Sequence, residues 1–301
     1  MTLRVVEIAE DGRFLHRQRG FMCVKADSAE LGRIPLDDIA CVIVTARGVS
    51  YSNGLLAALA ERGAVLVICG YNFLPIAWLW PISGNHVQAS RMDAQLETSK
   101  PFAKRAWQAV ARAKIDQQAA ILASLGGASA NALHSMAKRV KSGDPDNLEA
   151  QAARRYWPEL MGPDFRRDAD AGGRNAMLNY GYAVLRATTA RAIVSAGLHP
   201  TIGIHHRNIY NDMALADDLM EPFRPFVDLA VKRLLADGID DVTPEAKQRL
   251  SNVMVWDLPT PAGISPLGSC IGRLATSLAQ SLVDRTLNLA LPQKVLPLEI
   301  G

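Results

Sequence analysis

The stretch ACVIVTARGVSYSNGLLAALAERGAVLVICG, residues 40–70, sets the pattern of the N-terminal part of the chain. Its two ends, 40–46 and 64–70, are short apolar runs rich in β-branched residues, which predicts two buried strands. Between them, leucines recur at helical spacing in SNGLLAALAERG (52–63), after Ser and Asn residues that favour a helix N-terminus. Gly63 suits the end of that helix, so the stretch predicts a strand, a helix and a strand.

The residues before this stretch continue the strand pattern. LRVVEIA (3–9), RFLHRQR (13–19) and FMCVKAD (21–27) are short and rich in apolar or β-branched residues, and turn-forming residues such as EDG and DS separate them. Together with the two apolar runs already described, they predict a small β-rich domain over residues 1–85.

The pattern changes from strands to helices near residue 99. A series of long segments rich in Ala and Leu follows, with apolar residues at steps of three and four, and ALADDLMEPFRPFVDLAV (214–231) is one of them. Strands followed by helices predict an α+β protein with segregated parts. The polar stretch before the change predicts a linker over 86–100, and a larger all-α domain follows over 101–301.

Composition limits the class of protein. The chain has 301 residues, of which 49% are hydrophobic and 21% charged, enough apolar residues for a substantial core. Its apolar runs are far shorter than the ~20 residues that span a bilayer. The start, MTLRVVEIAEDGRF, has early charges and no long apolar run, so a secretory signal is not expected. We therefore expect a cytoplasmic protein without a membrane partner.

The cysteines lack the spacing of a zinc site or a disulfide framework. We expect them to be small buried apolar residues. They are Cys23, Cys41, Cys69 and Cys270.

Charge is distributed unevenly along the chain. The net charge is only +3, but residues 99–167 hold twelve Lys or Arg against six acids, which leaves −3 for the remainder. This asymmetry favours an anionic partner, and nucleic acid is the obvious one. A basic helical face in contact with solvent is the alternative that charge alone leaves open.

The stretch GIHHRNIYNDMALADDLMEPFRP, residues 203–225, brings histidines and acids close together. On a helix, Asp218 and Glu221 are about 60° apart around the axis, so one divalent cation can contact both carboxylates. Acids near a helix start also complement the helix dipole, and that structural role stays open. His205 and His206 follow a glycine, and an imidazole near paired carboxylates suits Mg²⁺ or Mn²⁺.

These residues carry a resemblance to a known family. The glycine-histidine stretch followed by ALADDLMEPFRP resembles the motif of the CRISPR-associated adaptation endonuclease/integrase, the universal and larger of the spacer-acquisition proteins. EAQAARRYW (149–157) and NAMLNYGYAVL (175–185) are similar to two further motifs of that family, in the same order. The histidine doublet, the RN-x-YN run (207–211) and the short N-terminal domain most resemble the version found in type II systems.

The resemblance implies a set of site residues. Glu149, His205 and Glu221 match the family's metal ligands, which implies Mg²⁺ or Mn²⁺ as the cofactor and makes the helical domain catalytic. Asp218 matches an additional catalytic acid, which would ligate the metal, orient a metal-bound water or position an incoming hydroxyl. His206 has no matching role, although a contact to a metal ligand or to phosphate would suit it.

Several neighbouring residues have two interpretations. Asp217 flanks Glu221 and is the weaker metal candidate. Tyr156 and Trp157 would stack on a frayed base or, as we prefer, pack in the core. Arg224 would fix the carboxylates, its preferred role, or hold phosphate.

The resemblance also implies the reaction and the partners. The family is a metal-dependent DNA endonuclease/integrase that inserts short foreign DNA fragments into a CRISPR repeat array, by transesterification of 3′-OH ends onto backbone phosphates. The implied partners are double-stranded DNA (spacer precursor and CRISPR repeat), a second copy in a homodimer joined through the β-rich domains, a small partner adaptation protein forming a heterohexamer, and the type II effector nuclease.

Six basic residues are candidate DNA contacts, because the basic segment would then follow the phosphates of the donor duplex. They are Lys104, Arg105, Lys138, Arg139, Arg154 and Arg155. The alternative function is a non-catalytic double-stranded DNA-binding scaffold of an adaptation complex, with the acids and histidines structural. A hydrolase of small phosphoesters is a third hypothesis, but it leaves the basic segment without a role.

Overall fold

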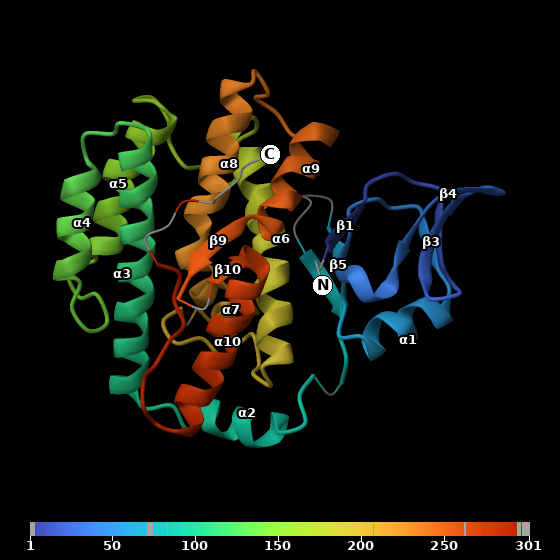
Figure 1. Ribbon diagram of the computed structural model, residues 1–301, viewed down its shortest axis with the longest axis horizontal. Coiled ribbons are helices and arrows are strands. Elements are labelled where there is room, and N and C mark those ends of the chain that lie inside the picture. The colour runs from blue at the N-terminus through green and yellow to red at the C-terminus, as the bar shows by residue number, and fades with distance from the viewer. Residues whose placement is uncertain are drawn as a thin grey trace. The chain divides into compact units, whose positions relative to one another are not determined.

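The computed structural model describes residues 4–70, 75–82, 84–206, 208–261, 263–293 and 296 (Figure 1). The chain divides into two compact units, Met1–His86 and Val87–Gly301. The first is β-rich and the second is mainly helical, which confirms the predicted α+β class. In the described part of the chain, none of the helices has the length and apolar character needed to cross a bilayer.

Two four-stranded sheets form the first unit. The first sheet has the order β1-β5-β7-β8 and contains β1 (Arg4–Ile8), β5 (Ile39–Val44), β7 (Val65–Cys69) and β8 (Pro75–Leu79). Its first three strands are parallel, and β8 is antiparallel to β7. All six residues of β5 are buried, as expected for a central strand of a parallel sheet.

The second sheet has the order β4-β3-β2-β6. It contains β2 (Arg13–Gln18), β3 (Phe21–Ala26), β4 (Ala29–Pro35) and β6 (Val49–Tyr51), and a 3₁₀ turn, η1 (Leu36–Asp38), follows β4. Strands β2, β3 and β4 form antiparallel hairpins, whereas β6 is parallel to β2.

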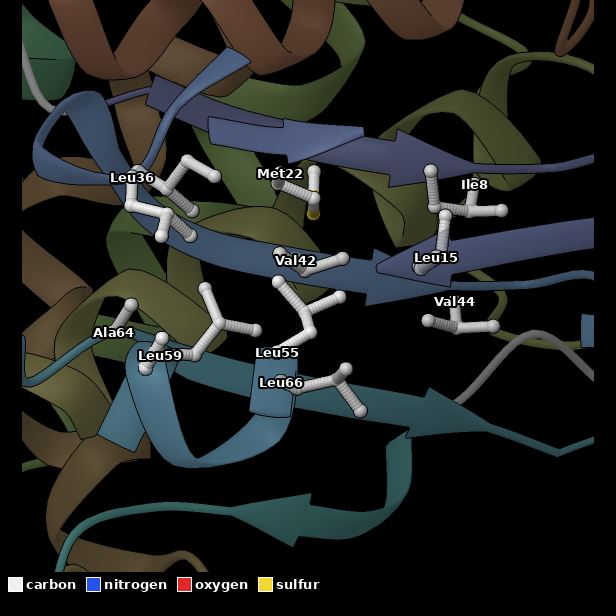
Figure 2. Close-up of a cluster of buried hydrophobic side chains, with 12 residues drawn as sticks. Ile8, Leu15, Met22, Leu36, Val42, Val44, Leu55, Leu59, Ala64 and Leu66 are labelled. Atoms are coloured by element: carbon white, nitrogen blue, oxygen red, sulfur yellow. The ribbon is translucent and has the colours of Figure 1, made fainter. Parts of the chain in front are cut away.

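A single apolar core joins the two sheets and helix α1 (Asn53–Glu61) in the first unit (Figure 2). Leu55 and Leu59 of α1 lie in this core, as their helical spacing predicted. The Ser52 hydroxyl accepts a hydrogen bond from the Leu55 N–H at 3.2 Å, so Ser52 caps the helix N-terminus. Gly63 has a φ of +66°, the left-handed conformation that ends many helices.

Helices dominate the second unit. They are α2 (Gln88–Leu96), α3 (Lys100–Ser124), α4 (Ala130–Arg139), α5 (Leu148–Met161), α6 (Arg174–Ser195), α7 (Ala214–Met220), α8 (Arg224–Ala236), α9 (Pro244–Asn252) and α10 (Leu267–Val283). Two 3₁₀ turns, η2 (Glu221–Phe223) and η3 (Val253–Val255), and one antiparallel hairpin, β9 (Asp257–Thr260) and β10 (Gly263–Pro266), complete it.

The second unit differs from the predicted elements in three places. The segment expected as a linker over 86–100 contains α2, because the buried Gln95 donates to His199 O and Ile202 O at 2.9 Å and so fixes this helix. The helix predicted over 214–231 is divided into α7 and α8 by η2, where Pro222 lacks the N–H that an α-helix needs. The hairpin β9–β10 was not predicted.

Close packing of α6 on α8 depends on one glycine. A Cβ atom added to Gly181 would lie 2.4 Å from Cγ1 of Val227. The absence of a side chain at this position therefore allows the two helices to approach each other.

The cysteines match their predicted role. All four of the described cysteines, Cys23, Cys41, Cys69 and Cys270, are buried thiols outside any disulfide.

Candidate active site

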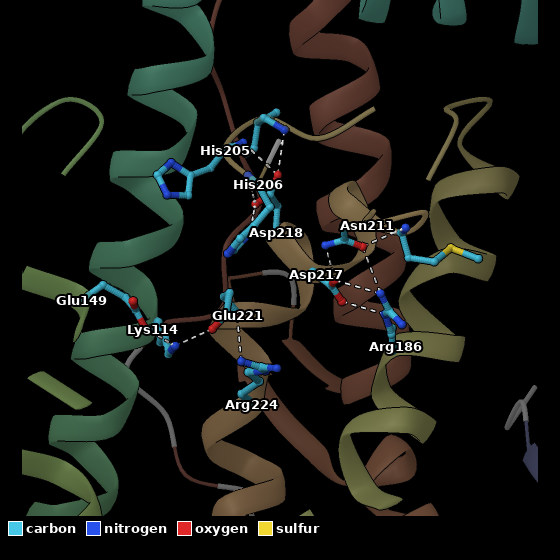
Figure 3. A network of polar contacts seen from close by, with 12 residues as sticks. Lys114, Glu149, Arg186, His205, His206, Asn211, Asp217, Asp218, Glu221 and Arg224 are labelled. Atoms are coloured by element: carbon cyan, nitrogen blue, oxygen red, sulfur yellow. Dashed lines mark hydrogen bonds and ion pairs between the residues drawn. The ribbon is translucent and has the colours of Figure 1, made fainter. Parts of the chain in front are cut away.

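Two of the three expected metal ligands meet at a buried lysine (Figure 3). Lys114 of α3 places its ammonium in an ion pair with Oε1 of Glu149 on α5 and 2.5 Å from Oε2 of Glu221 in η2. The Glu149 side chain is 24% exposed and the Glu221 side chain only 6%. The cluster is therefore closed on the η2 side and open to solvent at Glu149.

A second cation holds the other oxygen of Glu221. Nη1 of Arg224 lies 2.9 Å from Oε1 of Glu221. Burial by itself raises the pKa of Glu221, but the charges of Arg224 and Lys114 outweigh this and hold the pKa below its ordinary value. Burial likewise lowers the pKa of Lys114, and the charges of Glu221 and Glu149 outweigh it, so the pKa is raised. Lys114 and Glu221 are thus both charged at neutral pH.

Glu149 is positioned by the start of α5. The Asp144 carboxylate accepts hydrogen bonds from the backbone N–H groups of Leu148 at 2.9 Å and Glu149 at 3.0 Å, which satisfies two donors of the first helical turn. Ala152 and Tyr156, on the same helical face as Glu149, are fully buried. The face that carries Glu149 therefore points into the unit.

Asp218 organises the loop that carries the histidines. Its buried Oδ2 accepts from the backbone N–H of Ile204 at 2.7 Å and of His205 at 2.9 Å. Its Oδ1 lies 3.1 Å from the N–H of His206 and 2.6 Å from Nδ1 of the same residue. A Cβ on Gly203 would lie 2.9 Å from Oδ2, so the motif glycine is what allows this approach. Both carboxylate oxygens of Asp218 are engaged with the loop.

His205 is held by an aromatic side chain that the sequence analysis did not single out. Its ring stacks on Trp107 of α3, with ring centroids 3.9 Å apart and planes 4° apart. Burial lowers the pKa of His205, so the imidazole is neutral at neutral pH, the form that binds metals. Trp107 and Lys114 are two helical turns apart on α3, a spacing that places them on one face.

His206 has a different environment from its neighbour. The hydrogen bond to Asp218 raises the pKa of His206. Its ring lies edge-on to Trp107, with centroids 5.5 Å apart, and its side chain is 42% exposed. The second histidine therefore presents a partly exposed ring with an increased tendency to carry positive charge.

Asp217 faces away from this cluster (Figure 3). Its two oxygens accept from Nε and Nη2 of Arg186 at 2.7 and 2.9 Å, and the Asn211 amide donates to the same carboxylate at 2.8 Å. These contacts attach α7 and the loop before it to α6, which is a structural role.

A buried polar network lies behind Arg224. The guanidinium carbon of Arg224 is 4.5 Å from the centre of the Tyr182 ring, and the Tyr182 hydroxyl donates to Asp228. Burial raises the pKa of Asp228 to about 7. Tyr156 is fully buried and its ring centroid is 5.3 Å from that of Trp157, so Tyr156 packs in the core, as preferred from the sequence.

The six candidate DNA contacts are all exposed side chains of α3, α4 and α5. These helices pack against one another. Other basic residues of the segment are engaged internally; for example, Arg112 donates to Val140 O at 2.7 Å and Lys114 belongs to the acidic cluster. The exposed residues are Lys104, Arg105, Lys138, Arg139, Arg154 and Arg155.

The carboxylates of Glu149 and Glu221 and the imidazole of His205 are suitable ligands for a divalent metal, but they do not surround one common position in this structure. Within the described ranges, no three His, Cys, Asp or Glu side chains are arranged to hold an ion as they stand. Two carboxylates and a neutral imidazole nevertheless match the ligands that Mg²⁺ and Mn²⁺ accept. Oε2 of Glu221 is buried and its contact with the Lys114 ammonium lacks hydrogen-bond geometry, so a metal ion at this oxygen would have to replace Lys114.

Solved structures of other proteins share this fold. A solved casposase bound to an integration product has a TM-score of 0.81 and 22% identity, over 95% of this chain and 92% of that chain. A chain of a Cas6-RT-Cas1–Cas2 complex has a TM-score of 0.75 and 17% identity, over 97% of this chain and 36% of that chain. At these identities the likeness concerns the fold alone.

The sequence comparison is more specific. The pattern of the family described as CRISPR associated protein Cas1 matches residues 6–251. The CRISPR-associated endonuclease Cas1 of Neisseria meningitidis serogroup C (strain 8013) is 36% identical over 303 aligned positions, covering 99% of this chain and 98% of that protein. The chain therefore belongs to the Cas1 family. This confirms the resemblance and the prediction of an enzyme of the endonuclease and integrase class.

Proposed function

We propose that this protein is a metal-dependent DNA integrase that inserts short foreign DNA fragments into a CRISPR repeat array, by transesterification of 3′-OH ends onto backbone phosphates. Membership of the Cas1 family supports the proposal. The observation that carries it is the meeting of Glu149 and Glu221, from different helical elements, at one buried cation beside the loop of His205.

Glu149, His205 and Glu221 are the residues that would hold Mg²⁺ or Mn²⁺. The bound ion supplies a Lewis acid for a phosphoryl oxygen and reduces the charge of the in-line transition state. Arg224 keeps the Glu221 carboxylate oriented and ionised. Trp107 fixes the plane of the His205 ring by stacking.

Asp218 acts on His205 through the backbone in this proposal. Of the three roles left open by the sequence, direct ligation is disfavoured because both carboxylate oxygens already accept hydrogen bonds from the 204–206 loop. His206, held on Asp218 and partly exposed, contributes positive charge at the edge of the site where a phosphate approaches.

The exposed basic residues of α3, α4 and α5 bind the DNA backbone in this proposal. Arg154 and Arg155 are exposed side chains of α5, the helix that also carries Glu149. Contacts of this kind neutralise phosphates without reading sequence and make binding sensitive to salt.

The assembly proposed for the chain is a homodimer joined through the β-rich units, bound to a small partner adaptation protein in a heterohexamer. The solved Cas1–Cas2 complex with a similar fold supports the partner. A type II effector nuclease and a cytoplasmic location complete the proposal.

A strand-transfer assay tests the function. A short duplex with 3′-OH ends is incubated with a plasmid that carries a repeat array, in the presence of Mn²⁺. Glu149→Gln, His205→Ala and Glu221→Gln should each reduce joining about 10³-fold or more, since each removes a ligand that stabilises the transition state. Duplex binding should be retained.

Asp146→Asn is the matched control, because Asp146 is an exposed acid just before α5 that pairs only with Lys141 among the ion pairs found in the described chain. The alternative of a non-catalytic DNA-binding scaffold predicts that all four variants behave like the parent protein.

A further inference from the structure

Lys114 occupies the position between two carboxylates that come from separate elements. Glu149 lies in the first turn of α5, and Glu221 lies in η2. The Lys114 side chain is only 9% exposed, and its ammonium contacts both carboxylates. In Figure 3 the ammonium lies between them, with Arg224 on the far side of Glu221. The Lys114 ammonium therefore neutralises and holds the two carboxylates as a metal ion would, but with one positive charge.

The charges of this cluster are balanced without a metal. Two carboxylates face two cations, Lys114 and Arg224. A divalent ion at the same carboxylates adds two positive charges beside the ammonium, and like charges a few ångströms apart in a buried site repel strongly. Lys114 and the ion therefore compete for the same oxygens.

The two cations of the cluster are not equivalent. Arg224 is bound to Oε1 of Glu221 and is supported from behind by the Tyr182 ring. Lys114 is paired with Oε2, although this contact lacks hydrogen-bond geometry, and with Glu149, whose side chain is 24% exposed and therefore reachable from solvent. Lys114 is thus the cation that can leave, and its flexible stem lets the ammonium move while α3 stays in place.

We propose that Lys114 is a resident cation that holds Glu149 and Glu221 together before the metal binds, leaves them when a divalent ion arrives, and then contacts a phosphate of the bound DNA. This inference rests on the metal site of the proposed function. Lys114 would thus both position the two carboxylates before the metal binds and contribute a contact to the bound DNA.

A coupling between metal and DNA follows from this exchange. With the metal bound, the displaced ammonium lacks its carboxylate partners, and a DNA phosphate provides a new one. DNA should therefore tighten metal binding, and the metal should tighten DNA binding by the same factor, because linkage is reciprocal.

Metal titration of the full-length protein tests the exchange. Lys114→Met removes the charge and keeps a linear apolar stem, and Lys114→Arg keeps the charge. Bound Mn²⁺ is measured by the loss of the free-ion electron paramagnetic resonance signal. Lys114→Met should bind Mn²⁺ at least tenfold more tightly than the parent, and Lys114→Arg within about threefold of it. Lys141→Met, at an exposed lysine that pairs with Asp146, is the control and should match the parent.

Chemical labelling of the unmodified protein gives an independent measurement, which remains informative if Lys114→Met does not fold. Brief acetylation followed by mass spectrometry should leave Lys114 protected without divalent ions and modify it several-fold faster with Mg²⁺. Lys141 should react equally in both conditions. Adding duplex DNA together with Mg²⁺ should restore the protection of Lys114.

The outcomes separate this inference from the proposed function. If the parent binds Mn²⁺ and joins DNA, but folded Lys114→Met binds Mn²⁺ equally or more weakly, the exchange is refuted and the integrase proposal stands. Unchanged Lys114 labelling with Mg²⁺ refutes it in the same way. If the parent binds no Mn²⁺ and joins DNA without it, both proposals fail.

Discussion

Replacement of Asp218 by Asn separates a positioning role from a metal-binding role. The carboxylate accepts three backbone hydrogen bonds and contacts Nδ1 of His206. Asn keeps one oxygen for the N–H groups of Ile204 and His205, and its amide can donate to His206 Nδ1. The bond from the His206 N–H is lost, and the negative charge that strengthens the others disappears.

The expected cost follows from these contacts. A hydrogen bond to a charged group contributes about 1.5–3 kcal/mol and a neutral one about 1 kcal/mol. Losing one bond and weakening the rest should lower the free energy of unfolding by about 3 kcal/mol, measured by urea denaturation. The loosened loop misplaces His205, so strand transfer should fall about 10–100-fold.

The same variant can refute this reasoning. If Asp218→Asn unfolds at the parent's urea concentration but no longer binds Mn²⁺, Asp218 is a direct ligand and its bonds to the loop contribute little. Asp146→Asn, an exposed acid outside the cluster, serves as the control for the loss of one negative charge.

Three further predictions concern the core, pH and DNA. Gly181→Ala should destabilise the protein by about 1–3 kcal/mol or more through the clash between α6 and α8, whereas Gly272→Ala, with open space at its Cβ position in α10, should be neutral or slightly stabilising in thermal denaturation. Because burial raises the pKa of Asp228 to about 7, its contribution to the free energy of unfolding should be largest below pH 4 and decline as the pH rises to about 7; Asp228→Asn should remove that decline in urea titrations across this range. Arg154→Ala and Arg155→Ala should each lower the slope of log affinity against log salt by up to about 0.9 in duplex-binding titrations, and an unchanged slope would exclude that residue from the phosphate contacts.

The sequence predicted the elements whose pattern is local. The strand, helix and strand of residues 40–70 have the expected order. Ser52 caps the N-terminus of the helix, and Gly63, with its positive φ, follows the C-terminus. The division of the helix over 214–231 was missed, because its apolar stripe continues through Pro222 and masks the change to a 3₁₀ turn. Helix α2 was missed because its anchor, Gln95, is a polar residue that becomes buried only in the tertiary structure.

The site was predictable only in part for a similar reason. Glu149, His205 and Glu221 belong to motifs, so the family resemblance pointed to them. Lys114 and Trp107 belong to a long basic helix in which nothing local distinguishes them from their neighbours. Their importance comes from the face of α3 that meets η2 and the histidine loop, which is a property of packing.

Lys114 and the three expected metal ligands appear along the polypeptide in the order Lys114, Glu149, His205 and Glu221. During synthesis, a ribosome that has completed the first two hundred residues has made only one of the two acids that Lys114 joins. If these residues form the active site as proposed, the site is complete only in chains whose translation has passed Glu221, so shorter nascent or truncated chains should lack the activity.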